Sequence, residues 1–338
     1  MDLRTLGDTG LQVSSIGFGM WPIGGTVKSG DYGVTDLTEA ERSIKLALEQ
    51  GVTLYDCAPA YGAGLAEEVL GRALKGQREK SIITTKCGIY YDFAKEIWVR
   101  DSSKKAIIES AEQSLKRLQT DYIDLLLIHW PDSNTDPADA MAGLVHLKES
   151  GKVRFVGVSN FTIEQIKTYE KYGKVDVQQV GYNLFDRRIE EKMIKTCKDS
   201  GIGIMAYGSL CHGLLTGTWE EDKKFDSEDW RSQGDVFGLK LFTQENISAN
   251  VRVTKKLKKI AATNNLSLPQ LALAWVLANR DISVALVGMA TCEEVKENVL
   301  ASNVKLTAEV IANISDAMIE AQGTVAAHEY DFNNPERN

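Results

Sequence analysis

Short apolar segments, rich in β-branched residues, alternate with amphipathic stretches eight times along this chain. The expected strands are 15–19, 52–56, 81–86, 123–129, 153–158, 175–180, 202–206 and 283–287. Helical periodicity is expected between them, over 38–50, 64–75, 104–118, 137–150, 162–172 and 189–200. A strand–helix unit repeated eight times predicts an α/β fold, a closed parallel (β/α)8 barrel of the TIM type.

An open, doubly wound sheet is the alternative arrangement for such a pattern. Dinucleotide-binding sheets of that kind commonly carry a G-x-G-x-x-G turn after a strand. Here Gly17-Phe18-Gly19 is followed by Met20-Trp21-Pro22, so the third glycine is missing. The barrel is therefore favoured.

Several segments extend the simple barrel, and no linker or low-complexity tract divides the chain. A single domain is expected over 1–338, with an N-terminal hairpin over 1–14 and a C-terminal tail over 323–338. A long loop is expected after the seventh strand, over 208–246, and extra helices over 248–278 and 307–322. Long loops in compact domains are usually lids or binding loops.

Composition limits the partners and the compartment. The 338 residues carry a formal net charge of −8 without a block of Lys or Arg, so neither nucleic acid nor an anionic membrane is an expected partner. No apolar leader or run of 18 apolar residues occurs. Five scattered cysteines, without a C-x-x-C pair, predict reduced thiols in the cytoplasm and no metal site.

Four polar residues follow three of the expected strands. Asp56, Lys86 and His129 each end a strand, and Tyr61 lies in the loop after Asp56. Barrel enzymes place their sites at these strand ends, so the four side chains are expected to converge. An ammonium beside a phenol is expected to lower the phenol pKa, with Asp56 as the partner of Lys86 and His129 orienting a carbonyl. This set predicts proton delivery to a carbonyl oxygen.

Each of these residues also has a structural interpretation. An isolated Asp–Lys pair is more often a structural ion pair, a loop Tyr usually packs, and a His that ends a strand is often hydrogen-bonded in the core. The four together at neighbouring strand ends favour the catalytic interpretation.

The order and context of these residues resemble the aldo-keto reductase superfamily over nearly the whole chain, and most closely its bacterial broad-specificity reductases and sugar-type dehydrogenases. The matching segments are Gly17-Phe18-Gly19-Met20-Trp21, Asp56-Cys57-Ala58-Pro59-Ala60-Tyr61-Gly62, Thr84-Thr85-Lys86, Leu127-Ile128-His129-Trp130-Pro131, Gly157-Val158-Ser159-Asn160-Phe161 and Gln178-Gln179-Val180-Gly181-Tyr182-Asn183-Leu184. The resemblance implies an NAD(P)-dependent oxidoreductase that transfers a hydride between nicotinamide and an aldehyde, ketone, alcohol or sugar hemiacetal. Tyr61 would be the general acid/base, Lys86 and Asp56 would tune it, and His129 would orient the carbonyl.

The same resemblance implies the contacts of the cofactor and the substrate. Ser159, Asn160 and Gln179 would bind the carboxamide, and Tyr207 would stack on the nicotinamide ring. Gly208, Ser209 and Leu210 would pass the pyrophosphate, although the family's usual S-P-L is G-S-L here. The adenosine contacts would be Gly288, Met289, Glu294, Glu297 and Asn298, and the substrate pocket would include Trp21, Trp130 and Tyr90.

The adenosine turn departs from NADP-preferring relatives. These usually carry Lys or Arg in the loop at Gly288-Met289-Ala290, and Arg or Gln four residues before Asn298, where this chain has Glu294. A ribose 2′-phosphate needs cations, whereas a free ribose diol can donate to a carboxylate. NAD(H) is therefore expected to be preferred, with NADP(H) as the alternative if Lys296 or a lysine of the 218–246 loop approaches the phosphate.

Two other functional classes compete with this enzyme. One is a non-catalytic nicotinamide-binding sensor or auxiliary subunit on the same fold, which the four polar residues disfavour. The other is a barrel hydrolase or lyase that uses Asp56 and Lys86, which leaves Ser159, Asn160 and Gln179 unexplained. The expected partner is a small carbonyl or sugar molecule, and a homo-oligomer is possible.

Overall fold

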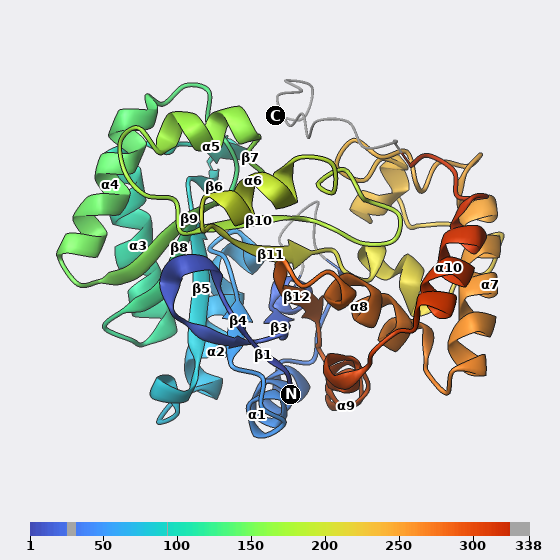
Figure 1. The fold of residues 1–338 in the computed structure, drawn as a ribbon. Coiled ribbons are helices and arrows are strands. Elements are labelled where there is room, and N and C mark those ends of the chain that lie inside the picture. The colour runs from blue at the N-terminus through green and yellow to red at the C-terminus, as the bar shows by residue number, and fades with distance from the viewer. Residues whose placement is uncertain (26–31, 93, 325–338) are drawn as a thin grey trace.

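Eight parallel strands close into a barrel in the computed structural model, which describes residues 1–25, 32–92 and 94–324 (Figure 1). The strands are β3 (Ile16–Gly19), β4 (Leu54–Asp56), β5 (Ile82–Cys87), β8 (Ile123–Ile128), β9 (Val153–Ser159), β10 (Val177–Gly181), β11 (Gly203–Tyr207) and β12 (Ile282–Gly288). They pair in this order, and β12 pairs with β3 to complete the ring. All eight expected strands and the expected barrel are confirmed.

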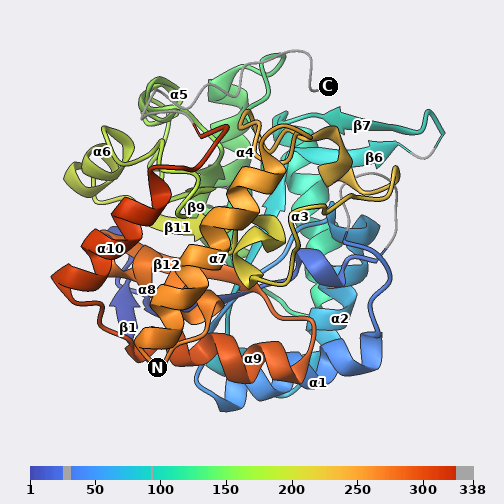
Figure 2. The same cartoon turned by 90° about the vertical axis from the view of Figure 1, so that its right-hand side faces the viewer.

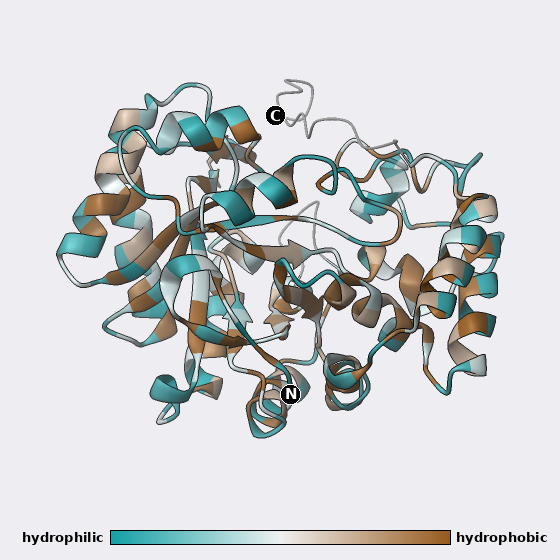
Figure 3. Ribbon diagram, viewed as in Figure 1, coloured by the Kyte–Doolittle hydropathy of each residue, from teal (hydrophilic) through white to brown (hydrophobic). Residues whose placement is uncertain are grey.

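Helices surround the barrel and turn their apolar faces toward it (Figure 3). They are α1 (Leu37–Glu49), α2 (Leu65–Ala73), α3 (Lys104–Leu118), α4 (Pro137–Glu149), α5 (Ile163–Tyr169), α6 (Met193–Asp199), α7 (Ile247–Thr263), α8 (Leu268–Ala278), α9 (Cys292–Asn298) and α10 (Ala308–Met318). In α3, for example, Ser103 caps the first turn, and the buried residues Ile107, Ala111 and Leu118 recur at helical spacing.

Helix α6 is shorter than the expected helix over 189–200. Glu190 accepts hydrogen bonds from the Tyr182 hydroxyl and the Arg187 guanidinium, at 2.7 and 3.0 Å. These contacts hold the preceding segment in a non-helical turn, so the regular helix begins only at Met193.

The expected N-terminal hairpin is present and closes one end of the barrel. Its strands are β1 (Leu3–Thr5) and β2 (Gln12–Ser14), which pair antiparallel. Leu6 and Val13 are fully buried in a cluster with side chains from the barrel interior. The catalytic groups therefore have to lie at the opposite end, where the parallel strands end.

A second hairpin was not expected. Its strands, β6 (Ile89–Asp92) and β7 (Ile97–Arg100), pair antiparallel after β5 and extend away from the barrel (Figure 2). The long loop over 208–246 contains only short 3-10 turns, at Cys211–Thr216 and Trp230–Gln233.

The extra helices are confirmed as α7, α8 and α10. The expected tail over 323–338 lies outside the described residues except for its first two positions. No helix in the described part of the chain is long and apolar enough to cross a membrane.

Candidate active site

One large cavity opens at the end of the barrel where the parallel strands end. Its volume is about 1780 Å³, well above the ~300–1,000 Å³ of most small-molecule sites. Its wall runs from the ends of β3, β4 and β10, past the loop after β11, to α8 and α9. A cavity of this size and length has room for a dinucleotide and a substrate together.

Lys86, on β5, contacts the end of β4 and the loop that follows it. Its ammonium nitrogen lies 2.8 and 3.0 Å from the two carboxylate oxygens of Asp56, 2.8 Å from the Cys57 carbonyl and 3.1 Å from the Tyr61 hydroxyl. The side chains of Lys86 and Asp56 are 0% and 5% exposed. An ammonium only donates, so the phenol oxygen accepts from Lys86 and keeps its own proton available to the cavity.

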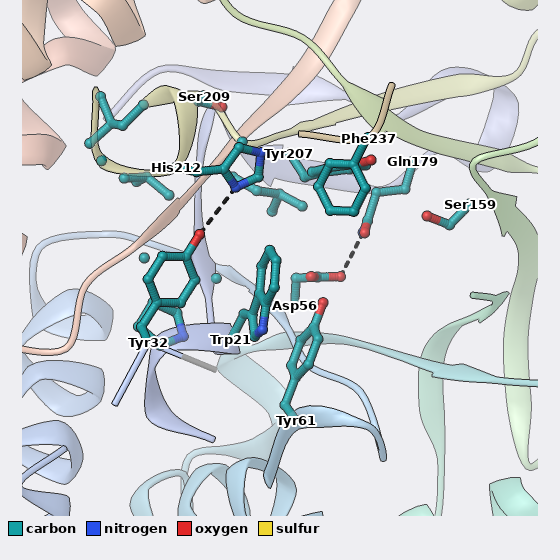
Figure 4. A pocket seen from close by; sticks show the side chains of 18 of the residues that line it. Trp21, Tyr32, Asp56, Tyr61, Ser159, Gln179, Tyr207, Ser209, His212 and Phe237 are labelled. Carbon is teal, nitrogen blue, oxygen red and sulfur yellow. Dashed lines mark hydrogen bonds between the residues drawn. The ribbon is translucent and has the colours of Figure 1, made fainter. Parts of the chain in front are cut away.

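The backbone around Tyr61 is set by a close contact between two loops. Gly62 has a φ of +61°, and a Cβ on it would lie only 1.8 Å from the Gly24 carbonyl oxygen. Only glycine allows this conformation and this approach. The contact fixes the position of Tyr61, which directs its hydroxyl toward Asp56 (Figure 4).

The pKa of Tyr61 moves in the direction opposite to the expected one. Burial raises the Tyr61 pKa well above its usual value, and the negative charge of Asp56 adds to the rise. The expected net lowering of this pKa is therefore not found, because burial is the largest cause and raises it. The phenol stays protonated at neutral pH, as a proton donor requires.

His129 is held as a neutral imidazole beside Tyr61. Burial lowers the pKa of His129 well below its usual value, and the charges of Lys86 and Arg100 lower it further. Its ring stands edge-on to the Tyr61 ring, with centroids 5.9 Å apart. The buried Nδ1 has no hydrogen-bond partner among the described residues. A neutral imidazole can therefore donate one hydrogen bond into the cavity.

The residues expected to bind nicotinamide line the same cavity. Asn160 accepts from the Tyr207 hydroxyl at 2.8 Å and donates to the Ser159 hydroxyl at 3.1 Å. Gln179 donates to Asp56 at 2.6 Å, so it belongs to the ion-pair network as well as to the cavity wall (Figure 4). The expected pyrophosphate residues Gly208, Ser209 and Leu210 follow in the wall.

The expected adenosine contacts divide into two groups. Gly288, Glu294, Glu297 and Asn298 line the cavity. Met289 does not: its side chain is fully buried in the core, because it follows β12 on the side that faces α1, and its carbonyl accepts from Ser43 at 2.9 Å. The cavity lining therefore does not support the predicted cofactor contact of Met289.

The expected substrate contacts also divide. Trp21 and Trp130 line the cavity, and Trp21 lies nearly parallel to the Tyr61 ring at 6.2 Å and to the Trp230 ring at 5.5 Å. Tyr90 is 47% exposed and lies outside the cavity lining, because it sits on the projecting β6–β7 hairpin. The cavity lining therefore does not support the predicted substrate contact of Tyr90.

Tyr32, Arg100 and His212 are among the cavity residues that the sequence analysis did not single out. The Tyr32 hydroxyl lies 3.1 Å from Nδ1 of His212, which joins the loop after β3 to the loop after β11 (Figure 4). No local pattern signals a contact across 180 positions.

His212 is expected to make the fold sensitive to acid. Burial lowers its pKa to about 3, against an unfolded value of about 6.5. Below pH ~6.5 the unfolded chain binds a proton that the folded chain excludes, so stability falls toward pH ~3 by up to ~1.4 kcal/mol per pH unit. Asn tolerates the local φ of 52°, so His212→Asn is a suitable test. In denaturant titrations, the free energy of unfolding of this variant should fall less steeply between pH 7 and 5 than that of the wild type.

His146→Asn is the matched control, because His146 is exposed on α4. This variant should keep the wild-type dependence of the free energy of unfolding on pH. An unchanged slope in His212→Asn would show that His212 does not carry this acid sensitivity.

Comparison with known proteins identifies the family. The sequence model described as the aldo/keto reductase family matches residues 15–319. The chain belongs to this family. It is 40% identical over 291 residues to the aldo-keto reductase YhdN of Bacillus subtilis (strain 168), covering 85% of each chain. It is 33% identical over 333 residues to the NADH-specific methylglyoxal reductase of Escherichia coli (strain K12), covering 94% of this chain and 98% of that protein.

A solved structure supports the same family. The glycerol dehydrogenase AKR11B4 from Gluconobacter oxydans matches with a TM-score of 0.85 and 31% identity, covering 96% of this chain and 97% of that one. This aldo/keto reductase is therefore an NAD(P)-dependent oxidoreductase, and the expected fold, family and enzyme class are confirmed.

Proposed function

We propose that Tyr61 is the general acid/base of a hydride transfer between NAD(H) and a small carbonyl or alcohol substrate. The observation that carries this proposal is the position of Lys86, whose nitrogen contacts the Asp56 carboxylate, the Cys57 carbonyl and the Tyr61 hydroxyl at once. A buried ammonium with these partners stabilises a negative charge on the phenol oxygen after its proton has left.

In the reducing direction, bound nicotinamide supplies the hydride to the carbonyl carbon. The Tyr61 O–H bond breaks and its proton moves to the carbonyl oxygen, which becomes the hydroxyl of the product. The phenolate that forms lies 3.1 Å from the Lys86 ammonium and is neutralised by it. In the oxidising direction Tyr61 takes the proton back, and its raised pKa favours that step.

His129 is proposed to orient the substrate. Its neutral ring stands edge-on to Tyr61, so a carbonyl oxygen that accepts from Tyr61 lies beside the imidazole. The rings of Trp21 and Trp130 in the cavity wall offer apolar surface to the carbon atoms of the substrate.

The residues of the long cavity fit a nicotinamide dinucleotide. Asn160, Ser159 and Gln179 offer amide and hydroxyl groups at the barrel mouth, beside the Tyr207 ring. Glu294, Glu297 and Asn298 lie in the same cavity at α9. We propose that the first group holds the nicotinamide end and the second group holds the adenosine end.

Turnover with nicotinamide tests the proposed function directly. Absorbance of the reduced cofactor should fall with methylglyoxal and rise with glycerol, the compounds for which two relatives are named. Absence of turnover with both cofactors across a wider panel of aldehydes, ketones and sugars would contradict the proposed function.

The preference for NAD(H) rests on the charge of the adenosine end. Glu294 lines the cavity, and its carboxylate also accepts from the amide and hydroxyl of Thr291 as part of the α9 cap. A 2′-phosphate beside it would be repelled. Lys296 pairs with Glu293 at 2.7 Å, whereas Lys240 and Lys258 are the exposed lysines of the cavity wall that can oppose this preference.

Glu294→Arg combined with Ala290→Lys is expected to shift the preference toward NADP(H). The wild-type chain should bind NADH about ten- to hundredfold more tightly than NADPH, since charge-assisted hydrogen bonds of roughly 1.5–3 kcal/mol are missing. Quenching of tryptophan fluorescence gives both dissociation constants.

Glu293→Arg is the matched control, because it places the same charge on the same turn outside the cavity lining. Tighter binding of NADPH to the unmodified chain would overturn the proposed preference.

The thiols agree with the proposed cytoplasmic location. All five cysteines are free, and four of them are buried. Such cysteines are typical of proteins in reducing compartments.

A further inference from the structure

Arg100 ends the unexpected β6–β7 hairpin and lines the active cavity. The side chain is half-buried, and its guanidinium carbon lies 5.5 Å from the centre of the Trp130 ring. Only one hydrogen bond holds it in the described part of the chain, from Nη1 to the Pro131 carbonyl at 3.2 Å. The other nitrogens of the guanidinium have no protein acceptor there.

Arg100 is also a cation without a salt-bridge partner. Among residues 1–25, 32–92 and 94–324, no carboxylate oxygen lies within 4.0 Å of its guanidinium. Asp132 is close, but its oxygens accept from the Ser102 amide and the Thr135 hydroxyl, at 3.0 and 2.6 Å. Burial lowers the pKa of Arg100, and the charge of Asp132 only partly offsets the effect.

An unpaired, partly buried cation is unfavourable for the fold alone. Arg100 has no carboxylate partner to offset its partial desolvation, and its contact with the Trp130 ring leaves the N–H groups of the guanidinium free to donate. The bond to Pro131 uses one of five N–H donors and does not require a charge. The remaining donors are suited to a planar or tetrahedral oxyanion, which a guanidinium binds in a fork.

We propose that Arg100 is the anion-binding residue of the substrate site, so that the preferred substrate carries a carboxylate or phosphate group away from its reacting carbon. This inference rests on the proposed function and specifies its substrate class. The reacting oxygen lies between Tyr61 and His129, and the anionic group reaches Arg100 across the Trp130 ring.

The order of groups along the cavity supports this orientation. The His129 ring stacks against Trp130 with centroids 6.5 Å apart, and the Arg100 guanidinium carbon lies 5.5 Å from the centre of the Trp130 ring. Arg100 is near enough to His129 to lower the pKa of the imidazole. The Trp130 ring therefore contacts both the imidazole and the cation, and a short carbon chain can pack on it.

Matched substrates test this assignment. One pair is butanal and succinic semialdehyde, and the other is glyceraldehyde and glyceraldehyde 3-phosphate. The wild-type chain should have a kcat/KM about ten- to hundredfold higher for the anionic member of at least one pair, and the favoured pair identifies a carboxylate or a phosphate. Arg100→Gln should lower kcat/KM much more for the anionic member of the pair than for its neutral partner, mainly through KM, and so bring this ratio close to one.

Two variants separate a local contact from a general charge effect. Arg100→Lys keeps the charge but loses the paired N–H donors of the guanidinium. It should therefore retain only part of the kcat/KM preference for the anionic aldehyde. Lys95→Gln removes a cation from the same hairpin, but that side chain is 71% exposed and outside the cavity lining, so the ratio should stay at the wild-type value.

The outcomes are distinct. Equal wild-type rates for both members of both pairs would overturn the inference, as would equal losses on neutral and anionic aldehydes in Arg100→Gln. Turnover of butanal or glyceraldehyde supports the proposed function regardless of this result. If no aldehyde is turned over, succinate is titrated against tryptophan fluorescence: binding that is lost in Arg100→Gln supports the anion site, and absent or unaffected binding overturns it.

Discussion

Tyr61→Phe is expected to lose about 10²–10⁴-fold in kcat and to bind the cofactor almost as well as the wild type. The substitution removes the hydroxyl that lies 3.1 Å from the Lys86 ammonium, but it keeps the ring that packs against Trp21. Cofactor oxidation gives kcat, and quenching of tryptophan fluorescence gives the dissociation constant.

Tyr55→Phe is the matched control for this experiment. Tyr55 lies on β4, but its hydroxyl is buried against the carbonyls of Ile44 and Val52 rather than facing the cavity. It should therefore leave kcat unchanged. Wild-type kcat in Tyr61→Phe would remove Tyr61 from the mechanism.

Lys86→Met is expected to damage both activity and stability. Without the ammonium, the phenolate left after proton transfer has no counter-charge, so kcat should fall by about 10²-fold or more and the pH profile of alcohol oxidation should move to higher pH. The Asp56 carboxylate, 5% exposed, also loses its partner, which typically costs about 3–5 kcal/mol of folding free energy. Denaturant titration and the pH dependence of kcat measure the two effects.

A double variant separates them. Asp56→Asn with Lys86→Met removes both charges. In the wild type Gln179 donates to Asp56, and the Asn amide oxygen can still accept this hydrogen bond. This variant should regain much of the stability, because a neutral pair is buried, yet remain inactive. Full activity in either variant, or an unchanged pH optimum in a still-active Lys86→Met, would contradict the role of Lys86.

The barrel was predictable because parallel strands covered by helices are continuous apolar runs with clear ends. The same feature placed Asp56, Lys86 and His129 at one mouth. The β6–β7 hairpin was missed because its strands have only four residues each and belong to no repeating unit.

Errors within the site have a different origin. Met289 was assigned to the cavity, although a single step along the chain after Gly288 turns a side chain from the cavity to the core. The pKa of Tyr61 was given the wrong direction because the depth of burial follows from the whole fold. The Tyr32–His212 contact joins two loops that are far apart in the sequence, and no local pattern encodes it.

The seam between β3 and β12 has a consequence for biosynthesis. Ile16 pairs with Ala285 and Gly19 pairs with Gly288, so the ring closes through residues from opposite ends of the chain. A nascent polypeptide that ends before β12 already contains Tyr61, Lys86 and His129, but β3 and β11 remain open edges able to pair with other chains. We therefore expect the growing chain to depend most on chaperones just before the last strand leaves the ribosome, and to become active only afterwards.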